Sequence, residues 1–325
     1  MAGQYWALNT AGGYLSNSAL SMKMRSVSQP YMRFRQFTEK QEDFGKHEGQ
    51  ILLFNKAMNV RTRGGRLAEG VPIPSTDFPL VQGTTTAYGF GNKINFTEEL
   101  EEFSRFDLPP LLESRLIDDM AKAINHNVAL QFQATAVMQT PTGSEGNPTS
   151  TWTTSGAIAT AATRNGIMYD YKDVADALQR GVYGTATGAP VPAYDGDNYI
   201  VIGSVGALRK VKDDPEFQTA SYYGDPERLF SGEVGRIYGL RFIADNSGEL
   251  SHTLGTTAFL GESVVFGQDP VMEIVVVAEE IRRGIPSDLG RDRSIGWYAI
   301  LGHQIIWSFN ATTEPDNRIV HITST

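Results

Sequence analysis

Two acidic clusters are the places where residue types in this chain could do chemistry. The run YDGDN holds Asp195 and Asp197, whose carboxylates could form part of a calcium-binding loop. The run lacks the distal glutamate that completes such a loop, and Asp-Gly is a strong turn signal. A turn is therefore favoured. An enzyme that holds a metal ion on these two aspartates is kept as an alternative.

The second acidic cluster follows a segment of alternating apolar residues. It consists of Glu98, Glu99, Glu101 and Glu102. Paired carboxylates can act as general acid and base. An acidic run at the start of a helix is more often a solvated face, because negative charge is favourable there.

The remaining candidates for chemistry are weaker. The chain has five histidines, and no two have the spacing of metal ligands: His47, His126, His252, His303 and His321. Phosphate-binding, dinucleotide-binding, zinc-protease and serine-hydrolase motifs are absent from the sequence. It also has no cysteine, which removes thiolate chemistry and fits a reducing compartment. We therefore expect no catalytic residue, no metal and no cofactor.

The composition and net charge of the chain limit the kinds of partner that it can have. The 325 residues are 41% hydrophobic, which is enough for a globular core. A net charge of −9 argues against a protein that binds nucleic acid by neutralising phosphates. The first residues have no basic segment followed by an apolar run, and no stretch approaches about 20 apolar residues. We expect neither secretion nor a membrane span.

The strongest structural signal is one long β-hairpin over residues 49–97. Its predicted arms, residues 49–62 and 84–97, each carry apolar side chains on one face: Leu52, Phe54, Met58 and Val60, then Tyr88, Phe90, Ile94 and Phe96. The glycines and prolines between the arms exclude a tight turn. Arms of about 14 residues extend about 45 Å. Because an isolated two-stranded hairpin is marginal in water, this one needs another surface, such as that of a neighbouring subunit.

Other elements follow from periodicity. Residues 1–48 are predicted to be an extended arm with one short helix around 35–43. A long helix is predicted over about 110–137, because Pro109-Pro110 precedes an apolar stripe with helical spacing: Leu112, Leu116, Met120, Ile124, Val128 and Phe132. The Thr-rich segment 139–166 is predicted to be a long connection or flexible insertion.

The second half predicts an α/β unit over 166–265 and then strands. In that unit we expect a helix from Asp170 through Arg180 that ends at Gly181, a strand at 199–202, and a helix from Ser204 through Val211. A further helix start is expected at residues 225–226 and a strand at 240–244. The final strands are expected at 272–278, 295–301, 304–309 and 318–322.

Residues 204–243 carry motifs of a known family. The chain has Leu208 in the first helix, then DDPEF at 213–217, GEVG at 232–235 and GLRF at 239–242. This order resembles the major capsid proteins of tailed bacteriophages, and is most similar to the coliphage N-four type. The end of the chain, residues 295–322, is similar to that family's end, and the resemblance covers about residues 50–325.

The resemblance implies an α+β fold of the Hong Kong 97 capsid type. It implies an N-terminal arm (1–48), an extended hairpin loop (49–97), a peripheral domain (98–165 and 266–325) built on a spine helix, and an axial α/β domain (166–265). The implied function is that of a structural major capsid protein, which forms pentamers and hexamers of an icosahedral head around double-stranded DNA.

The same resemblance implies the partners and the location. The partners are further copies of the chain, a portal, a separate scaffolding protein, optionally a decoration protein, and packaged DNA bound without sequence specificity; no membrane is involved. The location is the virion capsid, after assembly in the host bacterial cytoplasm. A tail tube or tail-spike subunit is a third hypothesis, since a long hairpin would suit it too.

Charge predicts one contact between subunits. The predicted hairpin tip is basic, with Arg61, Arg63 and Arg66, whereas the segment after the hairpin is acidic, with Glu98, Glu99, Glu101 and Glu102. In the fold that the chain resembles, the loop of one subunit lies over its neighbour. We therefore expect these seven residues to meet between subunits, against the alternative of two solvated faces.

Overall fold

The protein was analysed as a computed structural model. It describes residues 32–41, 47, 49–60, 64–67, 69–70, 72–73, 75–76, 78–104, 107–157, 161–215, 233–250, 261–310 and 314–323. The chain divides after Pro30 into two units, and all of the described residues belong to the second, Tyr31–Thr325.

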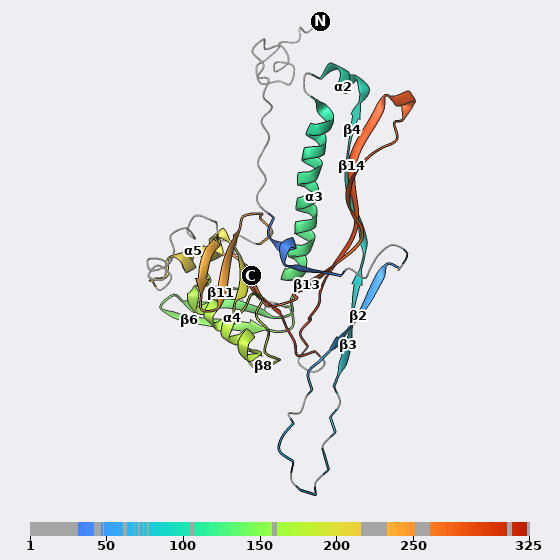
Figure 1. Ribbon diagram of the computed structural model, residues 1–325. Coiled ribbons are helices and arrows are strands. Elements are labelled where there is room, and N and C mark those ends of the chain that lie inside the picture. Colours follow the sequence, from blue (N-terminus) through green and yellow to red (C-terminus); the bar gives the residue numbers. More distant parts are fainter. Residues whose placement is uncertain are drawn as a thin grey trace. The chain divides into compact units, whose positions relative to one another are not determined.

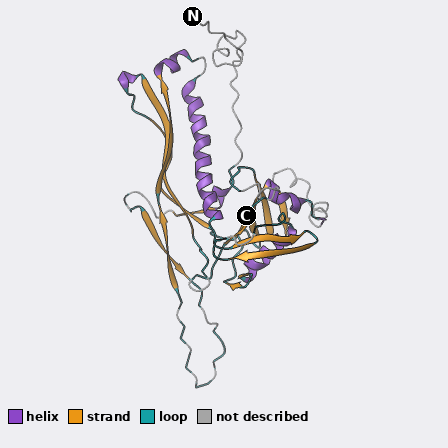
Figure 2. Ribbon diagram, turned by 180° about the vertical axis from the view of Figure 1, so that it is seen from behind, coloured by secondary structure: helices purple, strands orange, loops and turns teal. Residues whose placement is uncertain are grey.

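A four-stranded sheet and a long helix lie side by side in this unit (Figures 1 and 2). The sheet has the order β1 (Thr38–Gln41), β13 (Val271–Arg283), β14 (Asp292–Ile305) and β4 (Tyr88–Thr97). Strand β1 is parallel to β13, and the other neighbours are antiparallel. The helix is α3 (Leu108–Gln133).

The predicted long helix is confirmed, with its end four residues earlier than expected. Pro109 and Pro110 occupy its first turn, where a missing backbone N–H costs nothing. The predicted stripe is the core-facing side: Leu116, Ile124, Val128 and Phe132 are buried, while Leu112 and Met120 pack against the same core. No helix in the described ranges is both long and apolar enough to cross a membrane.

A seven-stranded mixed sheet forms the other main layer. Its order is β10 (Glu233–Ile237), β11 (Leu240–Asp245), β9 (Tyr199–Ser204), β12 (Ser263–Phe266), β15 (Ile319–Ile322), β5 (Met138–Ser144) and β6 (Asn147–Thr153). Alternate residues of its strands enter different cores. Ile200 and Ile202 join the core of α3, whereas Tyr199 and Val201 join the core of α4 (Met168–Arg180) and α5 (Val205–Lys212).

The capping signals at Ser204 and Gly181 are confirmed, whereas the helix start expected at Asp170 is not. Ser204 Oγ accepts a hydrogen bond from the N–H of Ala207 at 3.3 Å, which starts α5. Gly181 ends α4 with a φ of 67°, a conformation that costs glycine little. Helix α4 begins two residues before Asp170, whose carboxylate accepts from the N–H of Ile167 at 2.9 Å. The expected strands at 199–202 and 240–244 are β9 and β11.

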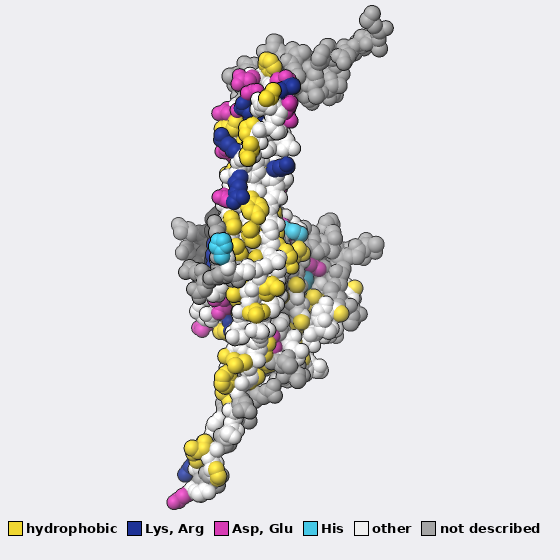
Figure 3. All heavy atoms as spheres, turned by 90° about the vertical axis from the view of Figure 1, so that its right-hand side faces the viewer, with side chains coloured by type: hydrophobic (Ala, Val, Ile, Leu, Met, Phe, Trp, Pro, Cys, Tyr) yellow, Lys and Arg dark blue, Asp and Glu magenta, His cyan; other side chains and the backbone are white. Residues whose placement is uncertain are grey.

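The predicted hairpin is partly wrong. Strand β2 (Ile51–Ala57) pairs with β3 (Leu80–Thr86), but β4 leaves this pair and joins β14 over its whole length, from Thr97 opposite Asp292 to Tyr88 opposite Leu301. The clean alternation of β4 therefore reflects packing on α3. The shorter β2–β3 hairpin projects beyond the sheet, with hydrophobic side chains on its surface (Figure 3).

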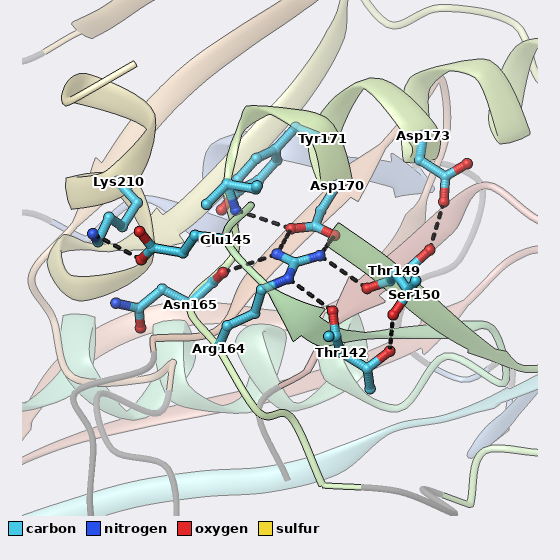
Figure 4. Close-up of polar contacts among 12 residues, drawn as sticks. Thr142, Glu145, Thr149, Ser150, Arg164, Asn165, Asp170, Tyr171, Asp173 and Lys210 are labelled. Carbon is cyan, nitrogen blue, oxygen red and sulfur yellow. Dashed lines mark hydrogen bonds and ion pairs between the residues drawn. The ribbon is translucent and has the colours of Figure 1, made fainter. Parts of the chain in front are cut away.

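The prediction for the Thr-rich segment is wrong for residues 139–153, because β5 and β6 form a hairpin that pairs with β15. Arg164 holds this hairpin to α4 (Figure 4). Its guanidinium donates to both carboxylate oxygens of Asp170, at 2.5 and 2.7 Å, and to the carbonyl oxygens of Thr142 and Thr149, at 2.8 and 2.9 Å. A buried, fully hydrogen-bonded arginine thus fixes the β5–β6 hairpin in place.

Smaller corrections concern the two ends of the unit. The strand expected at 295–301 is part of β14, which also includes residues 304–305, whereas residues 306–309 of the strand expected at 304–309 are not in a strand. The short helix expected around 35–43 is a single turn, η1 (Phe34–Phe37), followed by β1. The helix start expected at 225–226 lies outside the described residues, as do 216–217 of the DDPEF motif and Gly232 of the GEVG motif.

The predicted domain division does not follow the sheets. Residues 138–153 and β15 were assigned to the peripheral domain, yet they share a sheet with β9 and β11 of the axial domain. Sheet membership alone would place them with the axial strands. The division itself stays a prediction.

Candidate assembly interface

The β2–β3 hairpin is fixed to the rest of the unit at its base. Its inner face carries Leu52 and Phe54, which pack against a buried cluster that includes Met272, Ile274 and Ile306. The ring of Phe54 lies over Gly83 in the opposite strand, where a Cβ would collide with it. The inner face therefore contributes to the core of its own subunit.

A buried ion pair strengthens this attachment. The ammonium of Lys56 in β2 pairs with the carboxylate of Glu314 and donates to the carbonyl oxygen of Ile306 at 3.0 Å. The same carboxylate accepts from the backbone N–H and the hydroxyl of Ser308, at 3.0 and 3.2 Å. Both charged side chains are about 95% buried, so each depends on the other. The base of the hairpin is thereby held in one orientation.

The outer face of the hairpin, Ile51, Leu53 and Leu80, is uncovered. These side chains are 54%, 57% and 66% exposed. The described residues from Gly64 to Phe78 are all exposed, and they include further large apolar side chains: Leu67, Ile73 and Phe78. Apolar surface concentrated on a projecting element is typical of an interface. The hairpin is thus fixed to its own subunit by one face and available to another by the opposite face.

The charged residues predicted to meet between subunits lie in two places, the hairpin tip and helix α2. Arg66 is exposed, while Arg61 and Arg63 lie outside the described residues. The four glutamates lie in helix α2 (Glu98–Phe103), capped by Thr97, whose hydroxyl accepts from the N–H of Leu100 at 3.3 Å.

Three of the four glutamates have partners in the same chain. Glu98 and Glu101 pair with Arg293 at 2.5 and 2.6 Å, and Glu99 pairs with Arg291 at 3.4 Å. These three glutamates are therefore paired within their own chain. Glu102 is exposed and has no ion-pair partner among the described residues.

A second exposed apolar surface lies at the distal end, defined here as α2 and residues 284–292 of the turn between β13 and β14. Leu100, Phe103, Ile285 and Leu289 are 53%, 87%, 95% and 103% exposed. Sequence reasoning missed this surface. The available signal was the segment GIPSDLG, which places two large apolar residues among turn formers.

The residues considered for catalysis or metal binding do not come together in one site. Asp195 and Asn198 close the turn predicted there, and Asp195 lies 3.5 and 3.7 Å from the guanidinium groups of Arg236 and Arg241. Asp197 lies in the same turn. Within the described ranges, no three His, Asp or Glu side chains are placed to hold a metal ion.

The histidines in the described part of the chain have separate contacts. His126 contacts Glu249 at 2.6 Å and His321 contacts Glu262 at 3.3 Å. His47 is exposed, and His252 lies outside the described residues.

His303 belongs to a buried polar cluster that holds η1 and β1 on β13. Its Nδ1 lies 2.8 Å from the side-chain nitrogen of Asn127, and burial lowers the pKa of the imidazole to about 4. Burial also opposes ionisation of Glu273, but two hydrogen bonds and the positive charge of Arg35 outweigh it and lower the pKa of that carboxyl. Arg35 donates to Glu273 at 2.7 Å. The role of this cluster is therefore structural: it attaches η1 and β1 to β13.

The comparisons with known proteins rest on structure alone. No family model matches the sequence, and no curated protein matches it. The capsid of Helicobacter pylori bacteriophage KHP30 aligns with a TM-score of 0.69 at 12% identity, covering 97% of each chain. The capsid of Ralstonia phage GP4 aligns at 0.65 and 12%, covering 98% of each. The capsid of cyanophage Pam1 aligns at 0.61 and 14%, covering 100% of this chain and 99% of the other. These likenesses confirm the α+β fold of the Hong Kong 97 capsid type.

Proposed function

We propose that this chain is the structural major capsid protein of a tailed bacteriophage, and that it assembles with copies of itself into an icosahedral head. The observation that carries the proposal is the β2–β3 hairpin, which is fixed by a buried ion pair on one face and uncovered along the other. A lone subunit gains nothing from exposing that surface, whereas a neighbouring copy can cover it. Likeness to capsid proteins over nearly the whole chain supports the same role.

Electron microscopy of the purified protein tests the proposal. We expect closed shells of uniform diameter, formed by the protein alone or with a co-expressed scaffolding protein. Tubes would favour the tail hypothesis, and small discrete particles under every condition would contradict a capsid role. An activity that is lost in both Asp195→Ala and Asp197→Ala would favour the enzyme hypothesis.

The finer assignments are part of the proposal. We propose pentamers and hexamers as building units, with a portal, a separate scaffolding protein and packaged double-stranded DNA as partners, and a decoration protein as an optional one. The proposed location is the virion capsid, after assembly in the host bacterial cytoplasm. The motifs at residues 204–242 support membership of the N-four type family.

The predicted charge contact is retained as a proposal in a narrower form. We propose that Arg61, Arg63 and Arg66 of one copy approach helix α2 of another, where Glu102 is the acid without an ion-pair partner among the described residues. Exposed pairs contribute about 0–1 kcal/mol each, so apolar burial by the outer face would supply most of the contact energy.

Charge reversal tests this contact. Combined Arg61→Glu, Arg63→Glu and Arg66→Glu should reduce shell yield at low salt, and Glu102→Lys should restore part of it. Arg180→Glu, at the exposed end of α4, is the matched control. If the triple variant assembles as well as the parent at low salt, the contact is not charge-dependent.

A further inference from the structure

Residues 34–41, which form η1 and β1 and are called the strap from here on, contact three separate parts of the unit. Towards α3, the backbone N–H of Phe34 donates to Asn125 Oδ1 at 3.1 Å. Towards the seven-stranded sheet, the ring of Phe37 lies 5.2 Å from that of Phe266 in β12. Figure 1 shows the strap, in blue, beside the end of α3.

The third attachment, to β13, depends on one buried carboxylate. The strand β1 is at the edge of its sheet and pairs with only four residues of β13, 271–274. Among these, Glu273 is fully buried and accepts from the guanidinium of Arg35 at 2.7 Å and from the hydroxyl of Thr38 at 2.8 Å. Both donors belong to the strap, so the ionised carboxylate holds the strap on the sheet.

The imidazole of His303 lies directly opposite Glu273, on the neighbouring strand β14. An amide nitrogen can only donate, so the Asn127 side chain, 2.8 Å away, donates to Nδ1 and the neutral ring carries its proton on Nε2. That Nε2 is buried without a hydrogen-bond partner among the described residues. A second proton on the ring would place the Nδ1–H against the N–H of Asn127, two donors facing each other.

The charges around His303 do not compensate for its burial. Glu273 and Glu279 of β13 favour the protonated ring, whereas burial and the positive charge of Arg35 oppose it. On β1, the exposed Lys40 lies opposite Glu273 and adds a further positive charge on that side. Burial is the largest effect, and it lowers the pKa of the imidazole to about 4. By linkage, a proton on this ring favours any arrangement in which the ring reaches water.

We propose that His303 is an acid-sensitive switch for the strap, in which protonation of the buried imidazole favours release of residues 34–41 from α3 and β13. Of the elements around the ring, the strap is the least firmly held, because α3 and β14 lie in the core while β1 is a four-residue edge strand. A protonated His303 also competes with Arg35 for Glu273. The strap joins the N-terminal unit, Met1–Pro30, to the rest of the chain, so its release lengthens the link to that unit.

Hydrogen exchange with mass spectrometry on the purified, unassembled subunit tests the proposal. Exchange is measured at pH 7.5 and pH 5.0 and corrected for the intrinsic effect of pH on exchange. A pKa of about 4 in the closed state and 6.5 in the open state predicts that the strap opens about 30-fold more often at pH 5.0. The control segment is β6, an edge strand of the other sheet, whose exchange should change little.

Three variants identify the group that titrates. His303→Gln should abolish the acceleration of the strap, while His126→Gln, at an exposed position of α3, should keep it. Asn127→Asp provides an independent test, because a carboxylate can accept from the protonated Nδ1. In this variant the protonated ring is satisfied in the closed state, so most of the acceleration should disappear.

Each alternative result would overturn the switch. The strap of the parent could exchange at the same corrected rate at both pH values, or as fast in His303→Gln as in the parent at pH 5.0. Equal acceleration of β6 and the strap would mean that acid loosens the whole subunit. Because the measurement concerns the unassembled subunit, these results are independent of the capsid proposal, which electron microscopy tests separately.

Discussion

At the residue scale, the attachment of the hairpin depends on Lys56 and Glu314. Removing one partner of a buried pair leaves the other charge unpaired, which typically costs about 3–5 kcal/mol. Glu314→Gln should therefore lower the free energy of unfolding by about that amount in urea denaturation. The combined Lys56→Met and Glu314→Leu variant should recover most of the loss, because no buried charge remains.

Glu280→Gln is the matched control for this pair. Glu280 pairs with Arg282 at the surface, so the change should stay within about 1 kcal/mol. If Glu314→Gln costs no more than Glu280→Gln, the buried pair does not stabilise the hairpin base.

His303 predicts a dependence of stability on pH. Its folded-state pKa of about 4 is below the ordinary 6.5, so the folded protein favours the neutral imidazole. The stability that this provides is complete above pH 6.5 and is lost as the pH falls from 6.5 to 4. The loss should reach about 3 kcal/mol.

The measurement is the free energy of unfolding of parent and variant between pH 4 and 7. His303→Gln should flatten the curve in this window, while His126→Gln, an exposed control, should follow the parent. A His303→Gln curve as steep as the parent's would show that other groups control acid stability.

At the residue scale, the sequence suggested exposed charged residues as interface candidates, but it did not reveal the buried ion pairs. Lys56 and Glu314 are 258 positions apart, and Arg35 and Glu273 are 238 apart. Nothing local marks a charged residue whose partner is so distant. The seven predicted interface residues rest on charge and on the resemblance to a known fold. The partner of Glu98 and Glu101 in β14 could not be identified, because the strand pairing was unknown.

At the element scale, local signals succeeded where one residue type determines the backbone. The proline start of α3, the Ser204 cap of α5 and Gly181 after α4 were all predicted. Strand partners were harder, because alternation shows that a strand has one buried face but not what covers it. Residues 88–97 therefore pair with β14 and not, as predicted, with the first arm of the hairpin, whereas residues 84–86 do pair with that arm.

The tip of the hairpin should matter for assembly and not for folding. The described residues from Gly64 to Phe78 are exposed, whereas β2 and β3 contribute to the core. Replacing residues 61–77 with a short Gly-Ser linker should leave circular dichroism and the thermal midpoint near those of the parent, while shell formation is lost.

A matched replacement of the β5–β6 turn, residues 145–146, is the control, since it leaves the hairpin intact. If the tip-replaced protein fails to fold, the tip belongs to the core of its own subunit. If it forms shells in normal yield, the tip is not an assembly contact.

At the scale of the whole molecule, two cores share the seven-stranded sheet, and the hairpin and the distal end each leave apolar surface uncovered. The order of elements was predictable because each leaves a local pattern. The boundary between sheets was not, since β5, β6 and β15 reach the axial strands through contacts far apart in sequence. An uncovered apolar surface on an otherwise well-packed unit is the property that the capsid proposal explains.

The most direct test of that proposal is a cryo-electron microscopy reconstruction of the assembled particle. We expect a closed icosahedral shell in which Ile51, Leu53 and Leu80 are covered by a neighbouring copy, while Lys56 and Glu314 stay paired within their own subunit. A particle in which the outer face of the hairpin stays solvent-exposed, or folds against its own subunit, would contradict the proposal.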